Sequence, residues 1–215
     1  MTATIIGATG LIGGYLLEEL LQDNYYDTVR ILIRRPHEFT NPKLEKKLVD
    51  FNDAESFRLA LESSDVVFCA IGTTQKKVKG DKEAYRKIDY DITVNAAKIC
   101  KLNGCEKLVF VSSVGANSKS NNFYLKLKGE IEDAVKAVAL KAVQIMRPSV
   151  LLGDRKEFRL GEKISKGIMS VFSFLIPSKY RAIHGRDVAK AMVAVSKKTD
   201  IGFFVLEYKA IKNIF

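Results

Sequence analysis

A tyrosine and a lysine four residues apart are the most specific chemical feature of the sequence, in the segment Tyr124-Leu-Lys-Leu-Lys128. On a helix, residues at i and i+4 share one face, so the phenol and the ammonium can meet. A tyrosine hydroxyl can act as general acid, protonating a carbonyl oxygen that gains negative charge as it receives hydride. A neighbouring ammonium favours the phenolate and lowers the pKa of a tyrosine from its usual value of about 10. The pair therefore predicts proton transfer by Tyr124, tuned by Lys128.

A second pair with the same spacing, Tyr208 and Lys212, shows that spacing alone does not decide. Tyr124 lies eleven residues after Ser113, which follows an expected strand, whereas Tyr208 is expected within the last strand. A serine hydroxyl can orient a carbonyl and stabilise its developing charge. We therefore predict Ser113, Tyr124 and Lys128 as catalytic. Ser112 is adjacent and would point the other way, so which serine faces the site stays open.

A glycine-rich loop follows the first expected strand and opens the first helix, Gly7-Ala-Thr-Gly10-Leu-Ile-Gly13-Gly14. Gly7 permits a tight turn, Gly10 has no side chain to block an approaching pyrophosphate, and Gly13 lets the helix pack closely on the sheet. The free N–H groups and the dipole of the helix N-terminus favour phosphate. Placed between strand and helix, this loop predicts a dinucleotide site.

The second expected strand ends in Ile33-Arg34-Arg35, where a site that prefers NAD usually has an acid. A carboxylate binds the ribose 2′-hydroxyl and repels a 2′-phosphate, whereas arginine binds the phosphate and stacks on adenine. The sequence therefore predicts NADP(H) in preference to NAD(H).

Loops that follow the other strands supply the remaining expected cofactor contacts. Asp50 and Phe51 are expected near the adenine, the stretch from Ala70 to Thr73 near the nicotinamide ribose, and Lys128 at the ribose hydroxyls. The predicted cofactor-binding residues are Gly7, Thr9, Gly10, Leu11, Ile12, Gly13, Arg34, Arg35, Asp50, Phe51, Ala70, Ile71, Gly72, Thr73, Lys128 and Pro148. No metal ligands are predicted.

Short β-branched runs alternate with amphipathic stretches, which predicts an α/β fold. Strands are expected at 2–6, 28–33, 47–49, 65–70, 107–111, 142–146 and 202–207, and helices at 11–22, 53–61, 82–102, 123–138 and 187–196. Continuously apolar strands indicate a Rossmann-like, doubly wound parallel sheet with helices on both faces. We expect Asn52 and Asp187 to cap helices, and His184 to lie at a pocket rim or on the surface.

Residues 149–183 interrupt this alternation and include an apolar patch from Ile168 to Ile176. We predict a small C-terminal insertion that forms the substrate pocket, within one domain spanning 1–215. A plain packing subdomain is the alternative.

Composition excludes several classes of protein. The 215 residues are 47% hydrophobic, which is ordinary for a globular chain. Three cysteines without a CxxC pair and two distant histidines argue against a disulfide scaffold or a metal site. The net charge of +10 favours anionic partners, although a solvated lysine-rich surface is the preferred explanation. We expect no specific nucleic acid and no membrane span. Since no targeting segment is evident, a cytoplasmic location is expected.

Several motifs together resemble the atypical branch of the short-chain dehydrogenase/reductase superfamily. These are the glycine loop, Phe68-Cys-Ala-Ile-Gly-Thr-Thr74, Tyr124-Leu-Lys-Leu-Lys-Gly-Glu130 and Arg147-Pro-Ser-Val-Leu-Leu-Gly-Asp-Arg155. Within that branch the chain is similar to the family of the human HIV Tat-interactive protein, over about residues 3–210. The resemblance implies an NADPH-binding Rossmann domain with a Ser–Tyr–Lys constellation.

These observations predict an NADP(H)-dependent oxidoreductase that reduces a small carbonyl compound. The alternative is an NADP(H)-binding regulatory or sensor protein without turnover, which would have a protein partner. The substrate, the direction of reaction and the oligomeric state stay open.

Overall fold

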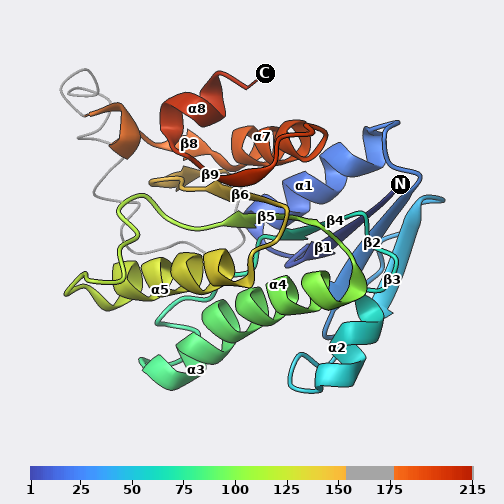
Figure 1. Ribbon diagram of the computed structural model, residues 1–215, viewed down its shortest axis with the longest axis horizontal. Helices are drawn as coiled ribbons and strands as arrows, with labels where there is room; N and C mark the ends of the chain where they lie inside the picture. Colours follow the sequence, from blue (N-terminus) through green and yellow to red (C-terminus); the bar gives the residue numbers. More distant parts are fainter. Residues whose placement is uncertain (154–176, 215) are drawn as a thin grey trace.

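Seven parallel strands form the central sheet in the computed structural model, which describes residues 1–153 and 177–214 (Figure 1). Their order is β3-β2-β1-β4-β5-β6-β9, and each neighbouring pair is parallel. The strands are β1 Thr2–Ile6, β2 Thr28–Ile33, β3 Leu44–Leu48, β4 Val66–Cys69, β5 Lys107–Val111, β6 Ala142–Met146 and β9 Gly202–Leu206. The predicted Rossmann-like fold is confirmed.

Helices cover both faces of the sheet (Figure 1). They are α1 Leu11–Gln22, α2 Ala54–Ala60, α3 Lys82–Arg86, α4 Ile92–Asn103, α5 Phe123–Val138, α7 Gly185–Ser196 and α8 Tyr208–Lys212. One core includes Phe110 and Leu127 on the α4–α5 side, and the other includes Leu16 and Ile31 on the α1–α7 side. Because both faces are buried, the inner strands are apolar at nearly every position.

Close packing explains two glycines of the loop between β1 and α1. Gly7 has φ +91°, a left-handed conformation that glycine adopts without strain. A Cβ atom at Gly13 would lie 2.0 Å from the carbonyl oxygen of Gly7. Helix α1 therefore approaches the loop more closely than any side chain would allow.

The helix predicted over 82–102 is interrupted by a π-helical turn. Between α3 and α4 lies η1, Lys87–Asp91, in which the backbone is wound more widely than in an α-helix. The hydroxyl of Thr93 donates to the carbonyl of Asp89 at 2.8 Å, which satisfies one backbone group of this turn. The turn leaves the Asp89 side chain buried.

Two predicted helix caps are wrong. Asp53, not Asn52, caps α2, because its carboxylate accepts hydrogen bonds from the N–H groups of Glu55 and Ser56. Helix α7 starts earlier than predicted.

The N-cap of α7 is His184, whose Nδ1 accepts the N–H of Arg186 at 3.2 Å. Asp187, the predicted cap, instead pairs with Lys212. His184 also lies against Tyr15, with ring centroids 5.5 Å apart.

Other differences concern element boundaries. Strand β3 begins three residues earlier than predicted, at Leu44, and Tyr208 opens α8 rather than lying in the last strand. Short strands β7 Leu151–Leu152 and β8 Ile183–His184 form a separate pair. Most of the predicted insertion, including the patch from Ile168 to Ile176, lies outside the described residues.

Replacing Gly13 by alanine should destabilise the protein by about 1–3 kcal/mol, the usual effect of overpacking. Gly14→Ala is the matched control on the same helix, since its Cβ would find its nearest neighbour at 3.8 Å. It should be neutral or should stabilise by up to about 1 kcal/mol through helix propensity. Urea unfolding measures both, and equal effects would contradict the close approach.

Candidate functional site

The loops after β1 and β4 touch each other at the carboxyl edge of the sheet. A Cβ at Gly7 would lie 2.9 Å from backbone atoms of Ala70 and Ile71. Strands β1 and β4 are neighbours: the chain continues from β1 to β2 and β3 on one side and then crosses to β4 on the other side of β1. This is the point where open α/β sheets bind ligands.

The first turn of α1 fits a phosphate group. Gly10 is the N-cap residue, and no side chain caps the turn in the described structure, which also has no acidic residue there. The N–H groups of Leu11, Ile12 and Gly13 belong to this first turn, where a helix lacks internal acceptors for its N–H groups. Together with the helix dipole they favour an anion. Thr9 is exposed beside them.

The loop after β4 is fastened by the helix α3–η1. The N–H of Thr73 donates to Asp89 Oδ1 at 2.7 Å, and the hydroxyl of Tyr85 donates to the Thr73 carbonyl at 3.0 Å. Both backbone groups of Thr73 are therefore held by side chains of one helix. Ala70 and Ile71 are half-buried and Gly72 is exposed, so this loop presents backbone at the edge of the sheet.

A buried ion pair joins that helix to α5. Lys128 Nζ lies 2.9 Å from Asp89 Oδ2, with side-chain exposures of 8% and 1%. Oδ2 has no hydrogen-bond partner in the described structure, so charge attraction holds this contact. Burial alone would lower the pKa of Lys128, but the attraction of Asp89 and then of Tyr124 outweighs it and raises the pKa above its ordinary value.

Tyr124 and Lys128 lie together as the helical spacing predicts. The ammonium is 5.9 Å from the centroid of the Tyr124 ring, and the tyrosine is half-buried. Ser113 is also half-buried, at the end of β5, and its hydroxyl donates to the carbonyl of Val114 at 3.3 Å. In the described structure it has no hydrogen bond to Tyr124 or Lys128. The structure thus shows a contact between the tyrosine and the lysine, whereas the recorded contact of the Ser113 hydroxyl is with the backbone of Val114.

Ser112 belongs to a different network. Its hydroxyl donates to the buried carboxylate of Glu132, which also accepts both Nε and Nη2 of Arg147. The Nε bond measures 2.9 Å. This network joins α5 to the ends of β5 and β6. Because the Ser112 hydroxyl is bonded within this network, the Ser113 hydroxyl is the one more available to a ligand.

The residues expected near the adenosine lie farther along the same edge. Arg34 and Arg35 are exposed immediately after β2, and neither has an ion pair or hydrogen bond in the described residues. Asp50 is exposed and accepts the N–H of Asn52 at 2.9 Å. Phe51 is half-buried, and its ring packs against that of Phe57. These side chains follow the ends of β2 and β3.

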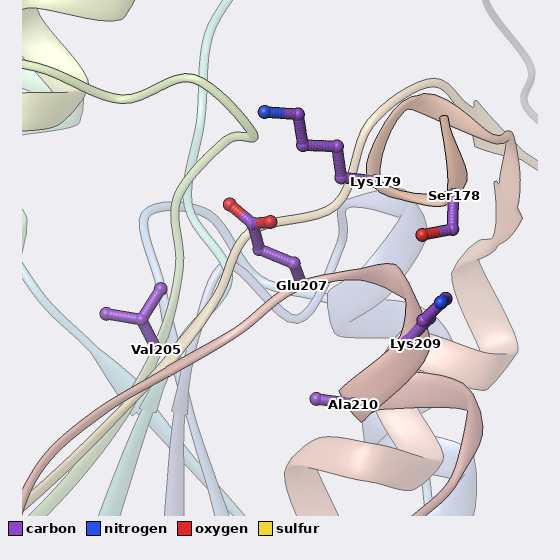
Figure 2. Close-up of a pocket in the computed structure, with 6 residues that line it drawn as sticks. All are labelled: Ser178, Lys179, Val205, Glu207, Lys209 and Ala210. Atoms are coloured by element: carbon purple, nitrogen blue, oxygen red, sulfur yellow. The ribbon is translucent and has the colours of Figure 1, made fainter. Parts of the chain in front are cut away.

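Beyond β6 the edge is hollowed by a pocket of about 340 Å³ (Figure 2). Its lining residues come from η2 (Ser178–Tyr180), the end of β9 and α8, and they are Ser178, Lys179, Val205, Glu207, Lys209 and Ala210. Glu207 lies 3.9 Å from Arg147, which connects this pocket to the Glu132 network.

Pro148, the last of the predicted cofactor-binding residues, is buried, and its carbonyl accepts the N–H of Val114.

Asp89 is the site residue that the sequence reasoning missed. A signal was available, because Tyr85, Asp89 and Thr93 follow at intervals of four and so share one helical face. All three are buried. An acid on an otherwise buried face indicates a charged partner in the core.

Comparison with known proteins identifies the family. The family described as NAD(P)H-binding matches residues 7–199. "Protein FMP52, mitochondrial" of Candida albicans is 34% identical over 204 residues, which cover 92% of this chain and 89% of that protein. "Protein HTATIP2" of Rattus norvegicus is 34% identical over 165 residues, which cover 75% and 67%.

Solved structures show the same fold at low identity. MoeE5 in complex with UDP-glucuronic acid and NAD is 20% identical with a TM-score of 0.75, covering 97% of this chain and 76% of that one. UDP-N-acetylglucosamine 4-epimerase from Bacillus cereus is 18% identical with a TM-score of 0.71, covering 99% and 82%. Both have the Rossmann-like fold that the sequence predicts for this chain.

The expected cytoplasmic location is wrong on this comparison. Relatives from Candida albicans, Debaryomyces hansenii and Candida glabrata are named as mitochondrial proteins. The expectation relied on seeing no targeting segment, and such an absence carries no information on compartment. None of the helices in the described residues has the length and apolar character to cross a membrane.

Removing either partner of the Asp89–Lys128 pair should destabilise the protein by roughly 3–5 kcal/mol at pH 7, because one charge is left buried alone. The raised pKa of Lys128 means that this stabilisation is present at neutral pH and is lost only as pH rises through that pKa. Asp89→Asn combined with Lys128→Met should lose less than the sum of the two single variants. Urea unfolding of the four proteins tests this, and strict additivity would contradict it.

Proposed function

The chain belongs to the NAD(P)H-binding family, and on that premise we propose that it is an NADP(H)-dependent reductase of a small carbonyl compound. The observation that carries the proposal is the contact of Lys128 with both Tyr124 and Asp89, next to the loop that Asp89 fastens. We further propose that the whole chain acts as one Rossmann domain, with part of 149–183 completing the substrate pocket.

Each catalytic residue has a separate task in this proposal. When bound, NADPH supplies a hydride to the carbonyl carbon. Tyr124 gives its hydroxyl proton to the carbonyl oxygen, so that the products are an alcohol and NADP⁺, and solvent returns a proton to the phenolate. Lys128 stabilises that phenolate by its charge and holds the ribose hydroxyls. Ser113 donates a hydrogen bond to the oxygen and so orients the carbonyl.

The cofactor contacts are proposed for the residues at the same edge of the sheet. The uncapped first turn of α1 would take the pyrophosphate, with Gly7, Gly10 and Gly13 allowing its approach. The fastened loop ending at Thr73 would contact the nicotinamide ribose.

Preference for NADP(H) is proposed from the two exposed arginines after β2. Arg34 and Arg35 have no ion-pair partner in the described chain, so their guanidinium groups are available to a 2′-phosphate.

Tyr124→Phe should lower the rate of NADPH oxidation by about 10²–10⁴-fold, because the proton donor is lost. Its NADPH affinity should stay near that of the wild type. Tyr208→Phe is the matched control, since Tyr208 has the same spacing to a lysine but lies on α8. Absorbance at the NADPH band, recorded with a fractionated small-molecule extract, measures the rate, and fluorescence measures binding.

Two outcomes would oppose the proposal in different ways. Full activity in Tyr124→Phe would remove the tyrosine from the mechanism. Tight NADPH binding without oxidation by the wild type would favour the regulatory alternative, in which a partner and the nucleotide change each other's affinity by the same factor.

Replacing both Arg34 and Arg35 by alanine should weaken NADPH binding by about tenfold or more, since a hydrogen bond to a charged group contributes roughly 1.5–3 kcal/mol. NADH binding should change little. Arg58→Ala, which removes a half-buried arginine on α2, is the control. Calorimetric titration with both nucleotides gives the ratio, and an equal loss for NADH would contradict the role in 2′-phosphate recognition.

A further inference from the structure

We propose that Asp89 is a positioning residue of this site: its carboxylate keeps Lys128 charged and fixed beside Tyr124 while fastening the Thr73 loop. This inference rests on the proposed function for the role of Lys128 toward the cofactor. The ion pair and the hydrogen bond that carry it are properties of the structure itself.

The two oxygens of Asp89 serve two different segments. Oδ1 accepts the N–H of Thr73 at 2.7 Å, and Oδ2 lies 2.9 Å from Lys128 Nζ. One carboxylate therefore connects the loop after β4 to helix α5. A shift of either segment would break a contact of Asp89. Because the Asp89 side chain is only 1% exposed, surface water could not take the place of the lost contact.

The π-helical turn is the local structure that makes this connection. Asp89 is the third residue of η1, and Thr93 in the next turn binds its carbonyl. Such turns occur frequently at functional sites. Tyr85, one turn earlier, donates its hydroxyl to the carbonyl of the same Thr73.

Among the residues that the structure describes, Asp89 is the one carboxylate that faces Lys128. The groups that face this lysine are Asp89 from η1, Tyr85 from α3, Cys69 from β4 and Tyr124 on its own helix. Burial lowers the pKa of a lysine, and an unpaired buried lysine can reach a pKa of about 5–6. Without the charge of Asp89, Lys128 would therefore lose its proton within the range in which enzymes work.

Asp89→Asn isolates this charge, because the amide keeps an oxygen that can accept the N–H of Thr73. Protein carrying ¹³C-lysine would be titrated by NMR from pH 6 to 10, with the Lys128 signal assigned by its absence in Lys128→Arg. In the wild type the signal should keep the ammonium shift throughout. In Asp89→Asn it should titrate below pH 9. Asp91→Asn removes a charge from the same turn without touching the pair and should behave as the wild type.

NADPH binding over the same pH range supplies the functional readout. In Asp89→Asn the affinity should fall with the Lys128 titration, by up to about tenfold per pH unit, the limit for one linked proton. Adding Lys128→Met should abolish that pH dependence. A purely structural role for Asp89 would weaken binding equally at every pH.

The results separate this inference from the proposed function. Wild-type protein that does not bind NADPH would refute the proposed function, while the lysine titration would still decide whether Asp89 keeps Lys128 charged. A Lys128 titration in Asp89→Asn that equals that of the wild type would overturn the inference. So would an NADPH affinity of Asp89→Asn that does not change over the pH range in which Lys128 titrates. If Asp89→Asn does not fold, the titration of the wild type decides, because loss of the Lys128 proton below pH 10 would contradict the inference.

Discussion

The ion pair between Asp89 and Lys128 connects the three segments that surround the proposed cofactor. Lys128 comes from α5, Asp89 from the turn between α3 and α4, and Thr73 from the loop after β4. Two charges so deeply buried are tolerated because each compensates the other and a backbone N–H satisfies the remaining oxygen. The same ammonium lies over the ring of Tyr124, one turn earlier on α5.

The parallel sheet explains why these segments meet. Every strand runs in the same direction, so the loops after β1, β2, β4, β5 and β6 all emerge at one edge. Close backbone contact between Gly7 and the loop at Ala70 fixes the central loops relative to each other. The residues proposed for the site are thereby spread along this edge, from the exposed Arg34 after β2 to the pocket at Glu207 after β9.

Much of this arrangement follows from local sequence patterns. The bounds of β1, α1, β5 and α5 agree with prediction because β-branched runs and helical spacing end at clear turn residues. The caps were harder, since Asn52 and Asp53 are equally good capping types and histidine is rarely one. The π-helical turn has no period of its own in the sequence, so Asp89 could be linked to Lys128 only through the packing of distant segments.

Transfer of hydride from NADPH to a carbonyl carbon is the central claim, and isotope labelling tests it most directly. Protein would be mixed with NADPH carrying deuterium at the transferable position and with a small-molecule extract, and the products would be analysed by mass spectrometry. The account predicts deuterium on carbon in one alcohol or a related group of alcohols, absent with Tyr124→Phe. Bound NADPH that transfers its label to no compound would contradict it.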